Sequence, residues 1–149
     1  MNEETVCRNL SFTDIPHIFR LGTLCFDWPS ESVLWTETTV QWYYENAQQV
    51  SFVAEHAGSV VGFALSFVRD NMGYLGWCAV DPQWRRRGIG TELCRKAVPA
   101  LQSHGARSVA VIAREDGRMD RLLKELGFRS DGFRKVEMLR VVDTPSETS

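Results

Sequence analysis

The chain has 149 residues, the usual size of one compact domain with a single core. Hydrophobic residues make up 44% of the chain and charged residues 24%, a composition typical of a globular protein rather than a disordered one. The formal charge of -2 excludes a global basic field that would recruit nucleic acid or an anionic membrane, so any anion site must be local.

The composition also argues against a secreted, membrane or metal-binding protein. The first ten residues are polar, and no apolar run approaches the ~20 residues that a membrane span needs. The cysteines and histidines are scattered along the chain, without a C-x-x-C pair, which argues against a structural metal. We therefore expect a cytoplasmic protein with reduced thiols, no metal and no membrane partner.

The first third of the chain predicts a short strand followed by helices. Asp14 is a common N-cap residue type and Pro16 is tolerated in the first turn of a helix, so a helix is expected to begin here. Apolar residues then recur at roughly helical spacing as far as Cys25. The elements expected are a strand over residues 5–9, a helix over 13–25, an aromatic-rich loop over 27–37 and a second helix over 36–47.

The middle of the chain predicts three consecutive antiparallel strands. Its β-rich runs are separated by short turn signals of the kind that join neighbouring strands. The runs cover residues 50–56, 59–69 and 74–80, with Ala57-Gly58 and a turn over residues 71–73 between them, and Asp81-Pro82 ends the third.

A long helix is expected over residues 88–104, because apolar residues recur every four positions on one face. Pro99 interrupts this pattern by removing a backbone donor and crowding the carbonyl of Arg95, so we expect a kink or an early end. After it we expect a buried strand over 107–113, a short helix over 117–126 stopped by Gly127, and a last strand over 135–142.

These elements predict an α/β fold, with a mixed and mostly antiparallel sheet flanked by helices. The sequence contains no repeat and no linker. We therefore expect a single domain over residues 1–142, followed by a polar C-terminal tail over residues 143–149.

The most informative window is the turn between the third strand of the middle region and the long helix. Three arginines, at positions 85 to 87, precede Gly88 and Gly90 at the start of the helix. A helix start presents unpaired N–H groups, glycines allow close approach, and arginine side chains suit a diphosphate. The window therefore predicts a pyrophosphate site, although a solvated arginine run beside a tight turn is the alternative.

Two other phosphate-binding loops are excluded by single residues. A Walker loop needs Lys and then Ser or Thr after its last glycine, but Thr91 and Glu92 follow Gly90. A dinucleotide-binding loop needs a third glycine where Leu93 stands.

In this window the chain resembles the GNAT acetyltransferase superfamily. The family motif, Arg or Gln, two residues, Gly, one residue, then Gly or Ala, stands here as residues 85–90, directly after a strand that ends in Ala79-Val80. Leu126-Gly127-Phe128 matches the family's terminal signature, and the order of elements agrees over nearly the whole chain.

The resemblance implies acetyl-coenzyme A as cofactor and a sheet that splays between its fourth and fifth strands, with the thioester in the gap. It implies that the strand end pairs with the pantetheine arm and that the following loop holds the pyrophosphate. The cofactor-binding residues implied are Cys78, Ala79, Val80, Arg85, Arg86, Arg87, Gly88, Ile89, Gly90 and Thr91.

The catalytic residues depart from the family pattern. Leu123 stands where many relatives carry the tyrosine that protonates the departing thiolate. Tyr74 stands where a glutamate base is common, and it either donates a proton or simply packs. Asp116 is the second catalytic candidate, but the ordinary role of Glu115 and Asp116 is to complement a helix dipole, and the charge of Asp116 could repel the cofactor.

The leading hypothesis is an N-acetyltransferase whose acceptor, a small-molecule amine or a protein amino group, attacks the thioester directly. A non-catalytic acyl-coenzyme A sensor is the alternative suggested by Leu123, and a domain with a dead phosphate site is a third. Monomer and homodimer both remain open. Aromatic residues in the acceptor region would suit a cationic amine, or else form helix core: Trp28, Trp35, Trp42, Tyr43 and Tyr44.

Overall fold

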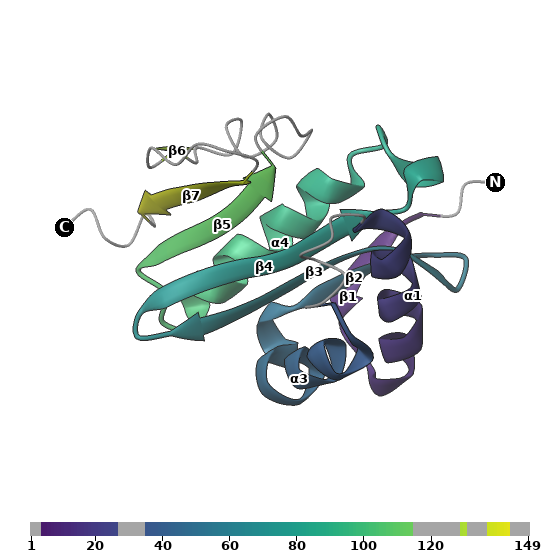
Figure 1. The fold of residues 1–149 in the computed structure, drawn as a ribbon, viewed down its shortest axis with the longest axis horizontal. Coiled ribbons are helices and arrows are strands. Elements are labelled where there is room, and N and C mark those ends of the chain that lie inside the picture. The colour runs from purple at the N-terminus through teal and green to yellow at the C-terminus, as the bar shows by residue number, and fades with distance from the viewer. Residues whose placement is uncertain (1–3, 27–34, 115–128, 131–136, 144–149) are drawn as a thin grey trace.

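A computed structural model of the chain describes residues 4–26, 35–114, 129–130 and 137–143. Within these ranges seven strands form one sheet, in the order β1-β2-β3-β4-β5-β7-β6 (Figure 1). Only β4 and β5 pair in parallel, and the other neighbours are antiparallel. The predicted mixed, mostly antiparallel sheet is therefore confirmed. No helix in the described part of the chain is long and apolar enough to cross a membrane.

The strands are β1 (Val6–Asn9), β2 (Phe52–His56), β3 (Ser59–Arg69), β4 (Met72–Val80), β5 (Ser108–Arg114), β6 (Arg129–Ser130) and β7 (Glu137–Asp143). The α-helices described are α1 (Ile15–Cys25), α3 (Glu37–Ala47) and α4 (Ile89–Ser103). Short 3₁₀ turns are η1 (Phe12–Asp14), η2 (Gln48–Val50) and η3 (Pro82–Trp84). The predicted helices before β2 are confirmed, and Thr36 caps α3 by accepting a hydrogen bond from the Thr39 N–H, at 3.1 Å.

Strand β3 lies at the centre of the core and is buried on both faces. On one face the ring of Phe63 stacks on Trp35, with centroids 5.6 Å apart. On the other, Ile89 and Leu93 of α4 each come within 3.2 Å of the point where a side chain on Gly62 would begin. Helices α1 and α3 therefore cover one side of the sheet and α4 the other (Figure 1), which explains the continuous apolar sequence of β3.

Two hairpins join β2, β3 and β4, and each turns on two residues with positive φ. Ala57 and Gly58 have φ values of 51° and 84°, as expected for the predicted linker. The second turn is formed by Asp70 and Asn71, with φ values of 52° and 68°, not by residues 71–73 as predicted. Asp and Asn tolerate this conformation, so β4 begins two residues earlier than expected, at Met72.

Pro99 does not end α4 early. The helix continues from Ile89 to Ser103 with the proline inside it. Pro99 is exposed, so water can satisfy the Arg95 carbonyl that loses its partner, while Ala97 and Leu101 on the opposite face are fully buried. Packing of that face outweighs the local cost of the proline, and the predicted early end is wrong.

The end of the chain matches the prediction in part. Strand β5 lies within one residue of the expected range, and β7 covers most of the predicted last strand. Asp143, expected to open the tail, is the last residue of β7. The short strand β6 was not predicted. The helix predicted over residues 117–126, Gly127 and the rest of the tail lie outside the described residues.

A buried carboxylate fixes the connection between β1 and α1. Arg8 donates to both oxygens of Asp14, at 2.8 and 3.0 Å, and the Ser11 N–H donates to the same carboxylate, at 2.7 Å. Burial opposes ionisation of Asp14, but the bonds from Arg8 and Ser11 outweigh it, so the pKa of Asp14 is lowered. The ionised carboxylate therefore stabilises the fold.

We expect Asp14→Asn to lower the free energy of unfolding by about 2 kcal/mol near pH 6, because it removes the charged partner of two Arg8 hydrogen bonds and leaves Arg8 only its bond to Glu55, at 2.7 Å, as an ion pair among the described residues. A lowered folded-state pKa contributes stability above the unfolded pKa, and this contribution is lost as pH falls through the folded value. The difference between wild type and variant should therefore shrink below about pH 4. Urea unfolding from pH 2.5 to 7 measures it, and a difference independent of pH would contradict the assignment.

Candidate active site

The sheet opens between β4 and β5. The two strands pair from Met72 and Ser108 as far as Leu75 and Val111, and no further pair joins them. Both strands continue beyond this point, β4 to Val80 and β5 to Arg114. The edge of β4 from Gly76 onward is therefore open on the side of β5, and the predicted splay between the fourth and fifth strands is confirmed.

The opening begins at a β-bulge. In the pairing of β3 with β4, Leu65 lies opposite Trp77 and Ser66 opposite Leu75, so Gly76 has no partner. Gly76 is exposed, and the Tyr43 hydroxyl lies 2.6 Å from the point where its side chain would begin. The glycine thus leaves room for a hydroxyl at the vertex of the opening.

Near the C-terminal end of β4, every second residue directs its N–H and C=O groups to the open edge. The Asp81 N–H donates to Val61 in β3, at 2.8 Å, so the peptide groups of Val80 and Cys78 point the other way. The Val80 carbonyl is already bound by Nε of Arg85, at 3.0 Å. The Cys78 peptide is left at the open edge, whereas that of Ala79 faces β3.

The start of α4 lies just beyond this edge. Gly88 is the N-cap, with φ of 81°, and no side chain described here caps the helix. The first helical bond runs from Glu92 N–H to the Gly88 carbonyl, at 3.0 Å. The amides of Ile89, Gly90 and Thr91 therefore lack helical partners. Apart from its two chain neighbours, no described residue has an atom within 4 Å of a Cβ built on Gly88. This geometry suits an anion.

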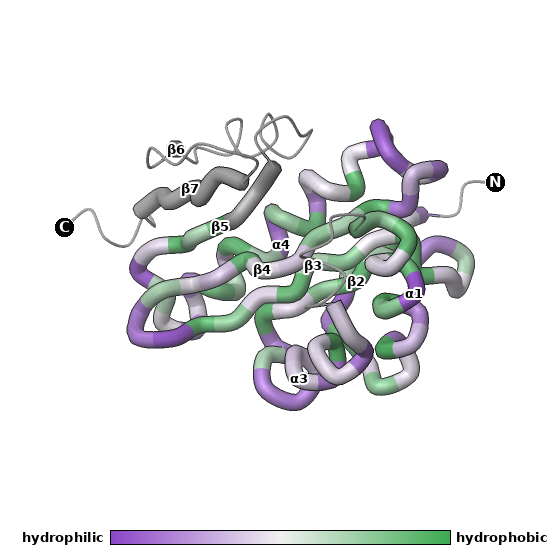
Figure 2. The backbone as a smooth tube through the Cα atoms, in the orientation of Figure 1, coloured by the Kyte–Doolittle hydropathy of each residue, from purple (hydrophilic) through white to green (hydrophobic). Residues whose placement is uncertain are grey.

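The three arginines of the loop have different environments. Arg85 folds back onto the end of β4, with Nη2 3.8 Å from the Cys25 sulfur. Arg86 is exposed and has a φ of 68°, and the guanidinium of exposed Arg87 stacks over Trp84, 4.5 Å from the ring centroid. The loop before α4 is strongly hydrophilic (Figure 2), and its free cationic groups are those of Arg86 and Arg87.

A strand edge that opens toward an uncapped, arginine-flanked helix start is the arrangement implied by the motif. The family model for the acetyltransferase (GNAT) family matches residues 15–128. The chain belongs to the GNAT acetyltransferase family. The resemblance drawn from the arginine and glycine positions is thereby confirmed.

Three relatives of this GNAT chain illustrate the range of the family. A Bacillus subtilis (strain 168) protein, provisionally named a ribosomal protein bS18-alanine N-acetyltransferase, is 24% identical over 139 residues, covering 91% of this chain and 87% of the relative. The crystal structure of the ribosomal-protein-S18-alanine N-acetyltransferase from Escherichia coli has a TM-score of 0.76 at 20% identity, covering 98% of this chain and 99% of the other.

The third is diaminobutyrate acetyltransferase EctA from Paenibacillus lautus, solved with L-2,4-diaminobutyric acid and coenzyme A. It has a TM-score of 0.74 at 20% identity, covering 95% of this chain and 96% of the other. The two structural likenesses establish that the GNAT fold extends over the described sheet and helices.

Thiols near the open edge of this GNAT chain are poor nucleophiles. A hydrogen bond with Cys94, followed by burial, raises the pKa of the Cys78 thiol well above its ordinary value. Burial also raises the pKa of Cys25, although Arg85 lies beside it. The same hydrogen bond lowers the pKa of Cys94, but Cys94 is only 1% exposed and is therefore out of reach of a substrate. Because the thiolate is the reactive form, this arrangement favours direct attack by the acceptor over an acyl-cysteine intermediate.

Of the two catalytic candidates from the sequence, only Tyr74 lies among the described residues. Tyr74 pairs with Ala110 of β5, before the opening begins, and its ring stacks on Phe67 with centroids 4.9 Å apart. This contact favours packing over proton donation for Tyr74. Asp116 lies outside the described residues, as do Glu115, Leu123 and the Leu126-Gly127-Phe128 signature.

The aromatic residues of the acceptor region have separate roles. Trp35 is 5% exposed and belongs to the core, whereas Trp42 is 42% exposed. Tyr44 packs edge-on against Phe12, and Tyr43 reaches the bulge of β4. Trp28 lies outside the described residues. The sequence pattern did not single out Gly76, although an isolated glycine inside a strand pattern is a known sign of a bulge.

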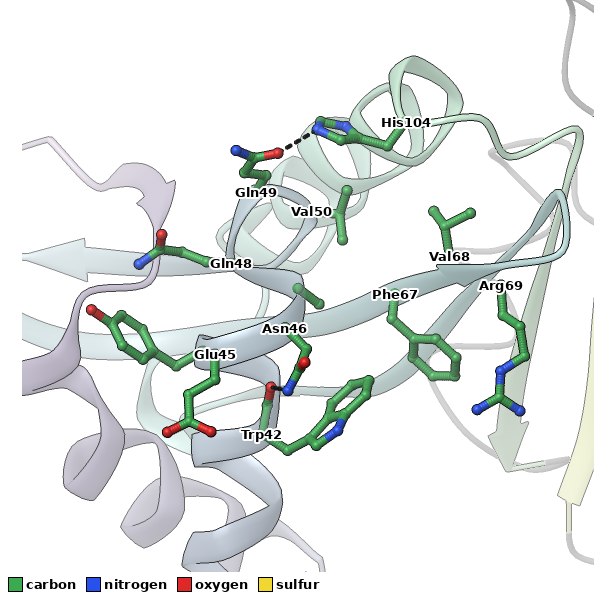
Figure 3. A pocket seen from close by; sticks show the side chains of 12 residues that line it. Trp42, Glu45, Asn46, Gln48, Gln49, Val50, Phe67, Val68, Arg69 and His104 are labelled. Carbon is green, nitrogen blue, oxygen red and sulfur yellow. Dashed lines mark hydrogen bonds between the residues drawn. The ribbon is translucent and has the colours of Figure 1, made fainter.

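A hollow of about 570 Å³ lies elsewhere on the GNAT fold (Figure 3). It is bounded by the end of α3, the η2 turn, the end of β3 and His104 after α4. His104 and Gln49 are hydrogen-bonded across it, at 2.7 Å. None of residues 81–88, the loop between β4 and α4, lines this hollow, so it does not lie at the start of α4.

Proposed function

We propose that the chain is an N-acetyltransferase that moves the acetyl group of acetyl-coenzyme A to a primary amine by direct attack. The observation that carries this proposal is the open edge of β4 from Gly76 to Val80, which leads to the uncapped start of α4. The pantetheine arm of the cofactor would pair with the open strand edge, and the pyrophosphate that follows it would bind at the helix start.

Some residues of the chain would bind the cofactor, and others would polarise its thioester carbonyl. The amides of Ile89, Gly90 and Thr91 would hold the pyrophosphate, with the guanidinium groups of Arg86 and Arg87 beside it. The Cys78 peptide would bind the pantetheine arm, as an added strand does. Bound acetyl-coenzyme A supplies an activated thioester, and an N–H of the open edge would stabilise the oxyanion formed on attack.

Direct attack requires two proton transfers, one from the attacking amine and one to the departing thiolate. A thiolate is already a good leaving group, so the absence of a tyrosine at position 123 does not prevent turnover. Water can remove the proton from the attacking amine. Tyr74 and Asp116 stay as candidates for general acid and base, and Asp116 has a better register than the adjacent Glu115.

Both classes of acceptor are represented among the relatives. The Bacillus subtilis and Escherichia coli proteins are named for a ribosomal protein alanine, and the Paenibacillus lautus protein for diaminobutyrate. We propose a primary amino group, on a protein or a small molecule, as the acceptor. We further propose that residues 1–142 act as one cytoplasmic domain, as a monomer or a homodimer.

Calorimetric titration with acetyl-coenzyme A and a thiol-release assay test the proposal together. We expect micromolar binding, and release of coenzyme A that depends on an amine from a panel of N-terminal alanine peptides, diaminobutyrate and polyamines. Binding without release for any amine would support the acyl-coenzyme A sensor instead. No binding at all would leave only an interaction domain.

A further inference from the structure

The buried hydroxyl of Tyr43 makes no hydrogen bond with the residues described. Tyr43 lies on α3 and is 6% exposed. Its ring packs against Trp42 and Phe67, with centroids 5.1 and 6.1 Å away, but these contacts leave the hydroxyl unpaired. An unpaired buried hydroxyl costs about 1–3 kcal/mol, so this one calls for a partner that the described part of the chain does not supply.

The hydroxyl lies at the vertex of the opening between β4 and β5. It is 2.6 Å from the point where a side chain on Gly76 would begin, and Gly76 is the first residue of β4 after its pairing with β5 ends. Although Tyr43 is buried, Gly76 beside it is exposed. The hydroxyl therefore lies directly beside an exposed residue of the open edge.

The surroundings of the hydroxyl keep it neutral. Burial raises the pKa of Tyr43 to about 12, so the phenol stays protonated at physiological pH. A phenol this weakly acidic is a poor proton donor to a thiolate. It can still accept a hydrogen bond from an amine and donate one in return.

We propose that the Tyr43 hydroxyl binds the acceptor amine and orients it at the vertex of the opening, by accepting an N–H of the primary amine. This inference rests on the proposed function, because it places the acceptor nitrogen where the thioester of a bound acetyl-coenzyme A would end. Tyr43 is thus an acceptor-binding residue, and the aromatic rings of Trp42 and Phe67 pack against its phenol ring.

Tyr43→Phe removes only the hydroxyl and tests this assignment. With a hexapeptide beginning with alanine and with diaminobutyrate as probes, we expect the KM for the active probe to rise about tenfold, the loss of one hydrogen bond. The KM for acetyl-coenzyme A and its calorimetric Kd should stay within twofold. Tyr44→Phe is the matched control, since Tyr44 is the next residue on the same helix and packs on Phe12 instead.

Gly76→Ala provides an independent test. Its methyl group would come within 2.6 Å of the Tyr43 hydroxyl and displace it, so the KM for the amine should rise as in Tyr43→Phe. In the double variant no hydroxyl remains to be displaced, and the second substitution should add little.

An unchanged amine KM in Tyr43→Phe, with wild-type turnover intact, would overturn this inference and leave the proposed function standing. Equal effects of Tyr43→Phe and Tyr44→Phe would also overturn it. If the wild type binds acetyl-coenzyme A but acetylates neither probe nor the wider panel, the proposed function fails first and the inference with it.

Discussion

Replacing Gly88 by tryptophan is expected to weaken binding of acetyl-coenzyme A by at least about 100-fold, because several phosphate hydrogen bonds of about 1.5–3 kcal/mol each would be lost. Gly88 is the N-cap of α4, and the space beside it is open for at least 4 Å. An indole there would occupy the volume in front of the free amides of Ile89, Gly90 and Thr91. Calorimetric titration of wild type and variant measures the loss.

Gly105 provides the control for backbone strain. It has a φ of 102° and, like Gly88, no atom of another described residue within 4 Å of an added Cβ, its chain neighbours aside. A left-handed conformation costs a non-glycine residue roughly 1–2 kcal/mol, so both tryptophan variants should lose similar stability. The two glycines flank a 15-residue helix, which separates them by about 20 Å. Gly105→Trp should therefore bind acetyl-coenzyme A as the wild type does.

The two variants together decide the position of the site. Loss of binding in Gly88→Trp alone places the pyrophosphate at the start of α4. Equal loss in both variants would attribute the effect to strain or partial unfolding. Full affinity in Gly88→Trp would show that the cofactor binds elsewhere and would refute the anion site.

The start of α4, where we propose that the pyrophosphate binds, was the part of the molecule most open to prediction, because it depends on local sequence. A strand end, a proline turn and closely spaced glycines specify a helix start within a few residues, and the structure has Gly88 at the N-cap. The side-chain directions of the arginines were not predictable in the same way. Arg85 folds back because the Val80 carbonyl and Cys25 lie beside it, and this depends on tertiary contacts.

The acceptor side was harder to predict because its residues meet only through the sheet. Tyr43 and Gly76 are 33 positions apart in the sequence, and the bulge that brings them together is visible only in the register of β3 and β4. The bulge places the adjacent residues Gly76 and Trp77 on the same face of the sheet, but a glycine has no side chain to mark this break in the alternation. Tertiary packing likewise overrides the local effect of Pro99, because α4 continues through the proline when its opposite face is buried.

The open half of β4 is supported from one side by an aromatic cluster centred on Trp35. Trp35 stacks on Phe63 and contacts Phe26 and Trp77, with centroids 5.6, 5.0 and 4.9 Å away. Its indole N–H donates to the Phe19 carbonyl, at 3.0 Å. Trp77 lies just after the bulge, so Trp35 connects α1 and the core of the sheet to the strand edge that forms the opening.

Trp35→Ala is therefore expected to lower the free energy of unfolding by about 3–5 kcal/mol, the cost of emptying a large buried site. That loss is a large share of the roughly 5–15 kcal/mol typical of a domain. Trp42→Ala is the matched control, since Trp42 is 42% exposed against 5% for Trp35, and it should cost less than half as much. Urea unfolding measures both values, and comparable losses in the two variants would mean that the Trp35 cluster does not anchor β4. Because Trp77 loses its largest neighbour, the affinity of the folded Trp35→Ala protein for acetyl-coenzyme A should also fall, whereas that of Trp42→Ala should not.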